Sequence, residues 1–388
     1  MIKGKKHLLS LINKLIGGYT VNKKLLVMVV GMLMMLLVVA CGDNNNGGNE
    51  LNNNGANDVE TNEDNGAEEE VEIDEEAAGD AEFTIRAGIG LNSEHPQYKG
   101  LEKFKELVEE ETDGAIYVET YHSGQLGDDR SMMEALQLGS QEVTVPSTAP
   151  IANFINEFSI FDFPFLFPNS EVADEVLDGE VGQKFLDMLD DQNLKGLAYW
   201  ENGFRDLTNS EQEVASVEDF EGLTIRTMEN DLHLDAFRAM GANPTPMAFT
   251  ELFTALQQGT VDGQENPFAT IYLEGFYEVQ DYVSDTHHIY SPFVFMMSKP
   301  FYDSLPEDYQ TVVDEAALEA GEYQRELNRE ANDQYLENLI EEGMTFTEIT
   351  DEAREEMREA IEPVLEEYAQ QIDQDLVDEV YQAIEDAE

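Results

Sequence analysis

Residues 246–267 read PMAFTELFTALQQGTVDGQENP, and they contain a helix signal followed by a strand signal. The segment TELFTALQQG predicts an amphipathic helix that stops at Gly259, because glycine is common just after helix ends. The following TVDGQENP predicts a short strand that runs into a loop at Pro267. A strand that follows a helix so closely is typical of α/β folds, and we expect one here.

Two carboxylates in this stretch, Asp262 and Glu265, raise the question of acid–base chemistry. Residues three apart in an extended segment point to opposite faces, so these two are poorly placed to act on one substrate. We expect Asp262 to lie at a turn before Gly263, and Glu265 to support the loop or pair with a base. Glu201 and Asp206 are the other candidate acid–base pair.

Other signs of catalysis or metal binding are weak. No order of serine, histidine and aspartate stands out as a hydrolase triad. His287 and His288 are adjacent, and neighbouring side chains on a strand point apart, which disfavours a shared metal ion. We therefore predict a protein that is not an enzyme and that uses no metal and no cofactor.

Outward from the opening stretch, strand and helix signals alternate along the chain. Strand-like runs occupy residues 83–90, 115–121, 142–147, 196–200, 223–226 and 287–298. Helical periodicity lies between them, at residues 95–114, 128–140 and 229–241. This alternation predicts a largely parallel sheet with helical cover. Residues 83–388, about 300 in number, suffice for two lobes.

The pattern becomes purely helical from Ser304. Ser304 and Glu307 have the spacing of a capping box, with a proline between them. Apolar residues then recur at helical spacing as far as Gly343, which predicts one helix of about 37 residues, or ~55 Å. Because a single lobe is much smaller than this, we expect the helix to span two lobes. The tail predicts further helix that is broken near Pro363.

Three polar residues stand where predicted strands end: Arg205, Arg226 and Asn266. In open α/β sheets, ligands bind beyond the carboxyl ends of the strands. Two guanidinium groups there would clamp a carboxylate, and the amide could donate to a carboxylate or a hydroxyl. The structural alternative also stays open, since residues 83–388 hold 68 acids against 15 bases and an arginine can simply pair with a neighbour.

The N-terminus predicts export. Lysines precede an apolar run from Leu25 to Ala40, which is short for a spanning helix of roughly 20 residues but fits a signal peptide over 1–40. The pattern LVVAC places Ala40 before Cys41, the single cysteine, and resembles a bacterial lipobox. That resemblance implies cleavage before Cys41, lipidation of its thiol and an extracytoplasmic protein anchored to the cell membrane. Val21 is an alternative translation start.

Residues 41–82 predict a disordered tether after the lipidated cysteine. They contain 15 acids and no base, and they have too few apolar residues to offset the entropy of ordering. The whole chain has a net charge of −62, which excludes nucleic acid as a partner, because phosphate binding needs a basic surface. Such a surface suits a salt-rich medium that screens self-repulsion, and an acidic protein of a low-salt organism is the alternative.

Several segments, in this order and spacing, resemble the substrate-binding proteins of TRAP transporters, the dicarboxylate- and sialate-type receptors. The resemblance covers roughly residues 83–388, and residues 246–267 are its most specific block. The other matching segments are SGQLGDDRSMMEALQLGS (123–140), FDFPFLF (161–167), NGFRDLTN (202–209), GLTIRTM (222–228) and GFYEVQ (275–280).

The resemblance implies a two-lobed periplasmic-binding-protein fold of type II-like α/β architecture, with mixed sheets, a hinge and a long helix spanning both lobes. Lobe I would be residues 83–202 plus about 292–331, and lobe II about 203–291 plus 332–388. The lobes would close on an organic acid. A monomeric receptor would then deliver this ligand to the small and large subunits of a sodium-coupled TRAP permease in the membrane.

The family's ligand-binding residues fall on motifs of this chain. Its selectivity arginine falls on Arg226, its second arginine on Arg205, its amide on Asn266 and its cleft aromatic on Phe249. Three further residues are candidate contacts on the variable side of the cleft: Glu94, His95 and Gln125.

Departures from the family pattern bear on the ligand. After the third strand, Ser147 and Pro150 stand where sialate receptors carry a Glu and an Arg that face the sugar, which disfavours sialate but keeps Ser147 as a candidate contact. Ectoine would suit a salt-rich habitat, but Phe249 stands where ectoine cages are more aromatic. A sugar acid such as a uronate, or a C4-dicarboxylate, stays open. A surface adhesion protein is the alternative from another class, suggested by the anchor and tether alone.

Overall fold

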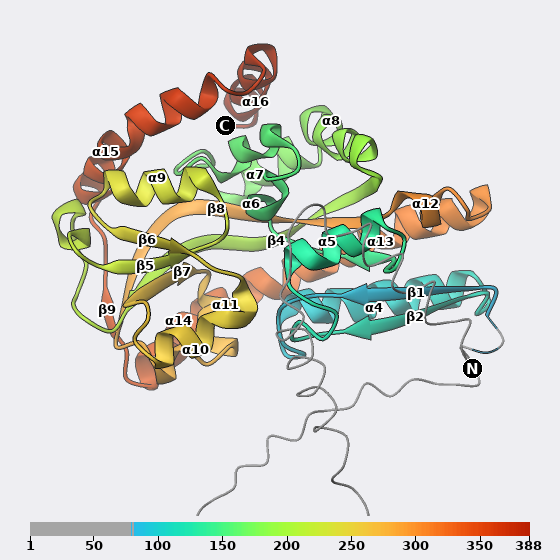
Figure 1. Ribbon diagram of the computed structural model, residues 1–388, viewed down its shortest axis with the longest axis horizontal. Helices are drawn as coiled ribbons and strands as arrows, with labels where there is room; N and C mark the ends of the chain where they lie inside the picture. Colours follow the sequence, from blue (N-terminus) through green and yellow to red (C-terminus); the bar gives the residue numbers. More distant parts are fainter. Residues whose placement is uncertain (1–78, 80) are drawn as a thin grey trace, which may run out of the picture. The chain divides into compact units, whose positions relative to one another are not determined.

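The computed structural model describes residues 79 and 81–388. The predicted signal peptide, the predicted lipidation site Cys41 and nearly all of the predicted tether lie outside the described residues. Among the helices that are described, none has both the length and the hydrophobicity needed to cross a bilayer. Residues 81–388 form a mixed α/β fold, which confirms the predicted fold class (Figure 1).

One sheet of nine strands runs through residues 81–388. Its order is β2-β1-β3-β8-β4-β7-β5-β6, and β9 pairs with β8 outside this path. The strands are β1 (Phe83–Gly88), β2 (Ile116–Tyr121), β3 (Val143–Thr144), β4 (Leu194–Asn209), β5 (Thr224–Thr227), β6 (Asn243–Pro246), β7 (Gly263–Asn266), β8 (Tyr282–Ser298) and β9 (Thr345–Thr347).

The two ends of the sheet are parallel and its centre is antiparallel. β1 pairs in parallel with β2 and β3, and β5 pairs in parallel with β6 and β7. In the centre, β4 and β8 run antiparallel to each other, and β7 and β3 are antiparallel to them. The prediction of a largely parallel sheet is wrong at the centre, because β8 runs antiparallel to β4 and pairs with it along its whole length. The mixed sheet that the resemblance implied is confirmed.

The central strands are longer than the sequence suggested. β4 has 16 residues and β8 has 17, because both continue through polar residues that interrupt their apolar runs. The register between them shifts at three places, and such bulges bend a strand. At one shift Gly203 takes a φ of 118°, a conformation that favours glycine. Arg205 therefore lies inside a strand, whereas the sequence placed it after one.

At one end of the sheet lie α4 (Pro96–Glu111) and α13 (Glu307–Glu330), which Figure 1 labels. Both helices pack against Trp200, the only tryptophan of the sequence. The Trp200 ring lies against Gly100 and Gly321, where an added Cβ would come within 2.8 Å and 2.6 Å of ring atoms. Its Nε1 donates to the carbonyl oxygen of Ala317 at 3.0 Å. The two glycines thus let both helices approach β4 closely.

At the other end, helices cover both faces of the sheet (Figure 1). On one face α9 (Asp231–Ala239) and α15 (Asp351–Ala369) enclose an apolar cluster around Phe237. On the other face a second cluster forms around Phe276. The helices of that second face are α10 (Phe249–Gln257), α11 (Phe268–Leu273) and α14 (Asn332–Glu341).

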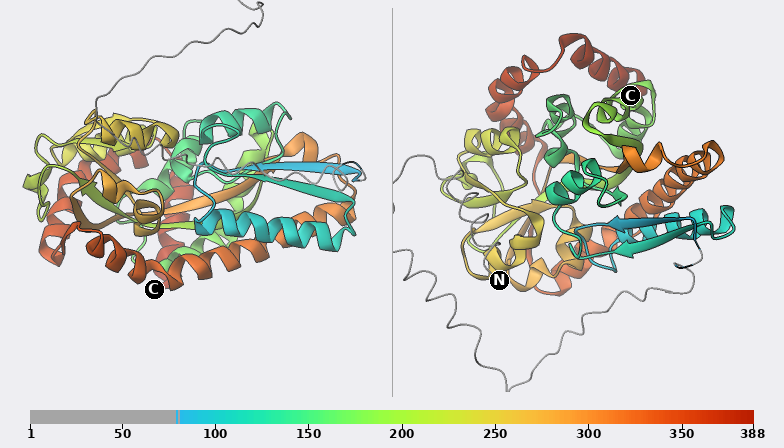
Figure 2. Two further views of the ribbon diagram at one scale, coloured as in Figure 1. Left: turned by 90° about the horizontal axis from the view of Figure 1, so that it is seen from below. Right: turned by 45° about the vertical axis from the view of Figure 1, so that its right-hand side comes forward.

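A third apolar cluster joins the middle of the chain to its last helix. The Phe161 ring packs against Phe158 and Phe185, with centroids 6.1 Å and 4.4 Å away. The helices around it are α6 (Thr148–Ile151), α7 (Ser170–Leu177), α8 (Glu180–Met188) and α16 (Gln374–Ala387). Figure 2 shows the chain curving from α15 round to α16. Residues 332–388 were predicted to belong to lobe II, yet α16 contacts α7 and α8 in the predicted lobe I.

The long helix predicted from Ser304 is two consecutive helices, α13 and α14, separated at Ala331. α13 contacts α4 and β4, whereas α14 contacts α11 at the other end of the sheet. Together they run along the molecule, as Figure 2 shows, which agrees with a helical connection spanning both lobes. The predicted capping box is wrong, because the Ser304 hydroxyl donates to the carbonyl oxygen of Phe301 at 2.6 Å.

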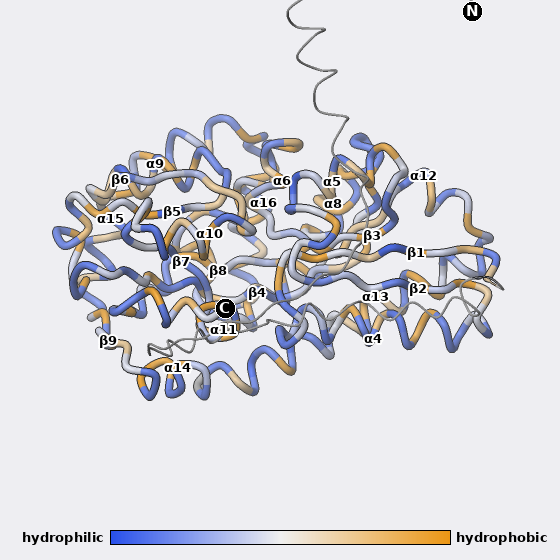
Figure 3. Tube along the Cα trace, turned by 60° about the horizontal axis from the view of Figure 1, so that its bottom comes forward, coloured by the Kyte–Doolittle hydropathy of each residue, from blue (hydrophilic) through white to orange (hydrophobic). Residues whose placement is uncertain are grey.

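The tail also differs in detail from its prediction. Pro363 lies inside α15, and the helical tail is interrupted further on, between Ala369 and Gln374. The covering helices are amphipathic: hydrophilic and hydrophobic residues alternate along α4 and α13 in Figure 3. The remaining short helices are α5 (Asp129–Gln137), α12 (Lys299–Tyr302), η2 (Asn156–Asp162), η3 (Leu189–Gln192), η4 (Val217–Phe220) and η5 (Phe276–Glu278).

Candidate functional site

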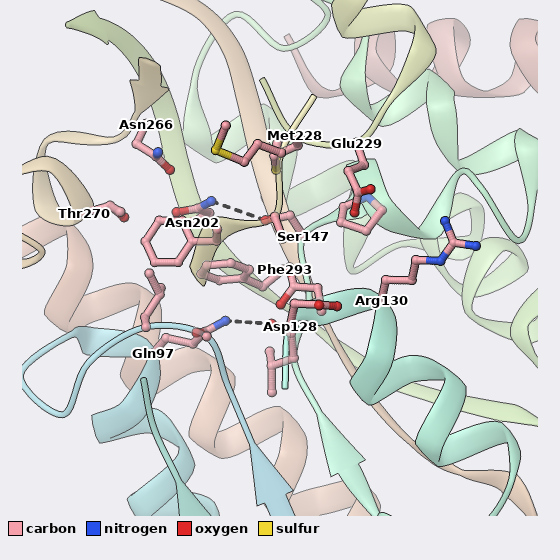
Figure 4. Close-up of a pocket in the computed structure, with 18 of the residues that line it drawn as sticks. Gln97, Asp128, Arg130, Ser147, Asn202, Met228, Glu229, Asn266, Thr270 and Phe293 are labelled. Atoms are coloured by element: carbon pink, nitrogen blue, oxygen red, sulfur yellow. Dashed lines mark hydrogen bonds between the residues drawn. The ribbon is translucent and has the colours of Figure 1, made fainter. Parts of the chain in front are cut away.

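A cavity lies where residues from both ends of the sheet meet (Figure 4). The space among its lining residues is about 630 Å³, including open solvent at the mouth. Five of the residues predicted to bind substrate line it: Arg205, Arg226, Asn266, Phe249 and Ser147. The structure thus brings together residues that lie up to 119 positions apart in the sequence.

Neighbouring strands position the three polar residues at strand ends. Arg205 lies on β4, Asn266 is the last residue of β7 and Arg226 is next to last on β5. In the sheet β7 lies between β4 and β5, so the three side chains come from adjacent strands. We expected the three residues to converge because each would end a strand. The order β4-β7-β5 explains why they converge although Arg205 does not end its strand.

Arg226 is held by a neutral acceptor. Its Nε and Nη2 donate to the carbonyl oxygen of Met247 at 3.0 Å and 2.8 Å. Its Nη1 is buried and has no hydrogen-bond partner among the described residues. Burial lowers the pKa of Arg226 to about 10, which leaves the guanidinium charged at neutral pH. The residue therefore presents a charged, unsatisfied donor to the cavity.

Arg205 is fully buried and is held by a carboxylate. Its Nη2 donates to Oε1 of Glu265 at 2.9 Å, and its Nε donates to Oε2. Burial alone would raise the pKa of Glu265, but the charge and hydrogen bonds of Arg205, together with the neighbouring His288 ring, hold it well below its usual range. Nη1 of Arg205 is again buried without a partner within the described part of the chain. Glu265 thus pairs with a base, as predicted.

Asn266 is oriented by a chain of buried amides and hydroxyls. Its Nδ2 donates to Oε1 of Gln264, and Nε2 of Gln264 donates to the Thr208 hydroxyl at 2.9 Å. The Thr208 hydroxyl donates in turn to Oε1 of Gln280 at 2.9 Å. This series of hydrogen bonds fixes the orientation of the Asn266 amide at the edge of the cavity, because one of its N–H groups is bonded to Gln264.

Polar and aromatic side chains complete the lining. Nδ2 of Asn202 donates to the Ser147 hydroxyl at 3.4 Å, a bond that is drawn in Figure 4. Oδ1 of Asn202 is buried and has no partner among the described residues. Phe249 starts α10 and packs against Phe276, with ring centroids 6.1 Å apart. Phe293 of β8 lies at the back of the cavity in the same figure.

Carboxylates also line the cavity. Asp128 caps α5 by accepting a hydrogen bond from the Ser131 amide at 2.8 Å, and Asp129 is the first residue of that helix. Glu229 follows β5. Burial and the neighbouring Asp128 raise the pKa of Asp129 to about 6, against the lowering effects of Arg226 and the Ser147 amide. The cavity is therefore not uniformly cationic.

Hydrogen bonds join the two sides of the cavity near Thr270. Asn92, in the loop after β1, donates its backbone N–H to Oε1 of Glu274 at 2.8 Å and its Nδ2 to the Leu273 carbonyl at 2.6 Å. The His95 ring lies 3.2 Å from the Thr270 hydroxyl. Burial raises the pKa of Glu274 to about 7. These bonds connect the predicted lobe I to the predicted lobe II.

Two predicted contacts lie elsewhere. Glu94 is exposed, and its carboxylate lies 3.5 Å from the Lys99 ammonium group. Gln125 is exposed in the loop before α5. Neither is among the residues that line the cavity, and their contacts with a ligand stay predictions. His95 is fully buried and does not line the cavity itself, but its ring contacts two lining residues, the Thr270 hydroxyl and the Gln97 amide.

The carboxylates considered for acid–base chemistry are occupied by structural partners. Those partners are the Thr224 amide for Asp262, Arg205 for Glu265, Arg329 for Glu201 and His287 for Asp206. His287 and His288 point to different partners, because His288 lies 3.3 Å from Glu265. Among the described residues no group of three or more His, Cys, Asp and Glu side chains is placed to hold a metal ion.

Sequence reasoning missed several lining residues. Asn202 stands in the same NGFR motif as Arg205, so its position was visible although its role was not. Gln97 and Thr270 lie on the first turns of helices, where polar residues are ordinary and carry no signal. Asp129 sits in a segment that was interpreted as a helix and as part of the family resemblance, and not as a ligand contact. Their placement follows from how the two ends of the sheet meet.

Comparison with protein families places the chain among known proteins. The family described as "Bacterial extracellular solute-binding protein, family 7" matches residues 87–371. A solute-binding protein of Verminephrobacter eiseniae is 41% identical over 278 residues, which make up 72% of this chain and 83% of the relative. The C4-dicarboxylate-binding periplasmic protein DctP of Rhodobacter capsulatus is 36% identical over 67% of this chain and 78% of its own.

A solved structure agrees with these relatives. The sugar acid binding protein DctPAm from Advenella mimigardefordensis strain DPN7T, in complex with galactonate, matches with a TM-score of 0.77 and 44% identity. The match covers 79% of this chain and 98% of that one. The likeness in sequence therefore extends over residues 87–371, the part of the chain that holds the cavity.

Proposed function

Since the chain belongs to the bacterial extracellular solute-binding proteins of family 7, we propose that it captures an organic acid in this cavity for a TRAP permease. The family consists of extracytoplasmic receptors that bind a solute for transport and are not enzymes. Arg226 and Arg205 hold the ligand's carboxylate, Asn266 and Ser147 add polar contacts, and Phe249 packs on its carbon chain.

One observation carries this proposal. Nη1 of Arg226 and Nη1 of Arg205 are both buried, both lack a partner among the described residues, and both arginines line one cavity. A buried donor left unsatisfied costs roughly 1–3 kcal/mol, so an acceptor that meets both donors relieves two such costs. A carboxylate has two oxygens, so each of them can accept a hydrogen bond from one of the two Nη1 groups.

Closure of the two predicted lobes would trap the ligand. The hydrogen bonds from Asn92 to Glu274 and Leu273 join the two sides beside the cavity, which supports a closed arrangement in this structure. Water is then excluded from the arginine–carboxylate contact, and a drier site strengthens it. Opening would break the same bonds and release the acid to the permease.

The cellular placement rests on the N-terminal residues. The short apolar run and the lipobox-like LVVAC sequence support an export signal and a lipid anchor at Cys41. The acidic tether would let the folded part, a monomer, reach the small and large permease subunits. These features support a lipid-anchored receptor at the outer face of the cytoplasmic membrane or in the periplasm.

A ligand screen tests the proposed function. The chain without its first 40 residues is mixed with dicarboxylates, uronates, other sugar acids and ectoine, and its melting temperature is measured at low and high salt. At least one acid should raise the melting temperature, and calorimetry should show that Arg226→Ala weakens its binding by ~100-fold or more. Arg238→Ala is the matched control, because Arg238 is an exposed arginine paired with Asp235. Retained affinity in Arg226→Ala would contradict the proposal.

A further inference from the structure

Carboxylates lie in the same cavity as the arginines that hold the ligand's carboxylate. Asp128 and Asp129 stand at the start of α5, and Glu229 follows β5. Asp129 and Glu229 form no ion pair within residues 81–388, although each lies close enough to Arg226 to affect its pKa. These acids therefore keep oxygen atoms available to a ligand.

The balance of charge leaves little room for a second anionic group. Glu265 compensates Arg205 from behind the cavity wall, and Arg130, at the exposed rim, pairs with Glu134 at 3.1 Å. Arg226 is then the lining cation without an ion-pair partner in the described part of the chain, and three acids face the same space. One ligand carboxylate satisfies Arg226, whereas a second would meet like charges, which costs affinity.

One buried acceptor atom in the lining has no hydrogen-bond donor among the described residues. Asn202 is 4% exposed, and its Oδ1 has no partner among the described residues. Its Nδ2 is bonded to the Ser147 hydroxyl at 3.4 Å, which fixes the amide with Oδ1 free. A carboxylate cannot satisfy this oxygen, but a hydroxyl group can donate to it.

We propose that the site selects a monocarboxylate with a hydroxylated chain, such as an aldonate, and that Asp129 sets this selectivity against dicarboxylates. This inference rests on the proposed function, because it assumes that Arg226 fixes the ligand's carboxylate. The ligand's hydroxyls donate to Asn202 and to Asp129, and the Asp129 charge repels a second carboxylate. Hydrogen bonds to an ionised carboxylate are among the stronger ones, so a hydroxyl there adds both affinity and selectivity.

The selectivity of Asp129→Asn tests the inference. Calorimetry measures galactonate and succinate with the wild-type chain, with Asp129→Asn and with Asp113→Asn, at one pH and salt concentration. Asp113 is exposed and outside the cavity, so Asp113→Asn removes the same charge from the protein without touching the site. Wild type should bind galactonate at least about tenfold more tightly than succinate, and Asp129→Asn should reduce that ratio by about tenfold.

The outcomes separate this inference from the proposed function. If Asp129→Asn changes galactonate and succinate alike, or if wild type prefers succinate, the assignment of Asp129 is overturned while carboxylate capture by Arg226 stands. If neither acid nor any other carboxylate binds, both fail together. Should Asp129→Asn not fold, as judged by its urea transition, Asp129→Ser is measured in its place, because serine removes the same charge from the cavity lining. An unchanged ratio in that variant also counts against the inference.

Discussion

Arg205 and Arg226 are two buried arginines of one cavity, and they differ in what holds them. Each gives Nε and Nη2 to the protein and leaves Nη1 free. Arg205 meets the full negative charge of Glu265, whereas Arg226 meets the neutral carbonyl of Met247. A buried cation is costly unless an anion compensates it. The charge of Arg205 is therefore compensated within the fold, whereas Arg226 has no ion-pair partner among the described residues and is left for an anion from outside.

The difference divides structural and binding roles between similar residues. Loss of the Arg205–Glu265 pair should chiefly weaken folding, because it strands a buried charge between β4 and β7. Loss of the Arg226 guanidinium should chiefly weaken ligand binding, because its protein partner is one carbonyl oxygen. The predictions below separate these two effects.

Glu265→Gln should cause the largest change. It leaves the Arg205 charge buried without its anion while keeping the side-chain shape, and breaking a buried pair costs roughly 3–5 kcal/mol of folding stability. Urea unfolding measures the change. Glu134→Gln is the matched control, since its pair with Arg130 is exposed and is worth at most about 1 kcal/mol. Equal losses of folding stability in the two variants would contradict the structural role that we assign to the Arg205–Glu265 pair.

Arg226→Lys should weaken binding strongly and folding weakly. An ammonium group keeps the charge but lacks the planar fork that serves Met247 and the ligand together. We expect ~30- to 100-fold weaker binding of the best acid, with stability within about 1 kcal/mol of wild type. Calorimetry and urea unfolding on the same samples measure both. Wild-type affinity in Arg226→Lys would show that a point charge suffices.

Acid pH should reduce the contribution of the Arg205 pair. The pKa of Glu265 in the folded state lies below its unfolded value of 4.5, so the pair's stabilisation is complete above pH 4.5 and is lost as pH falls below it. The stability gap between wild type and Glu265→Gln should therefore be constant from pH 7 to 5 and narrow towards pH 3. Because many other acids titrate there, only this gap is informative. A gap that widens on acidification would contradict the assignment.

Asn92→Ala should cause the smallest change. It removes the side-chain bonds to the Leu273 carbonyl and from the Glu94 amide and keeps the backbone bond to Glu274, and none of these bonds involves Arg205, Arg226 or their protein partners. One hydrogen bond is worth about 1 kcal/mol, so ligand release should be about fivefold faster in stopped-flow measurements. The same factor is expected in the Arg226→Lys background, since closure and clamping act separately. A factor that differs between backgrounds would show that they are coupled.

The sequence placed three residues in one site more successfully than it described their surroundings. Arg226, Arg205 and Asn266 were expected together because strand-end position and a family motif agreed on them, and all three line one cavity; their binding of a carboxylate stays a prediction. The sequence predicted that Glu265 would support the loop or pair with a base, but it did not identify Arg205 as that base. The register between β4 and β7 decides which residues pair. The length of β4 was missed, since its polar residues mask a buried strand. Glu94 and Gln125 were predicted to contact the ligand, and both lie in loops. Loop sequences place few local constraints on the direction in which a side chain points.

The acidic lining shows a further limit of sequence reasoning. Asp129 lies 97 residues before Arg226, and nothing local to either residue signals that they share a cavity. Their proximity depends on how both ends of the sheet meet across β4 and β8. Selectivity, which depends on such pairs, is therefore harder to predict than the carboxylate clamp.

The structure of the complex with the most tightly bound acid tests the central claim most directly. The account predicts that the two oxygens of one ligand carboxylate lie within about 3.2 Å of Nη1 of Arg226 and Nη1 of Arg205. It also predicts that Arg205 keeps its pair with Glu265 and Arg226 its bonds to Met247. A ligand carboxylate placed elsewhere in the cavity, with both Nη1 atoms unoccupied, would contradict the account.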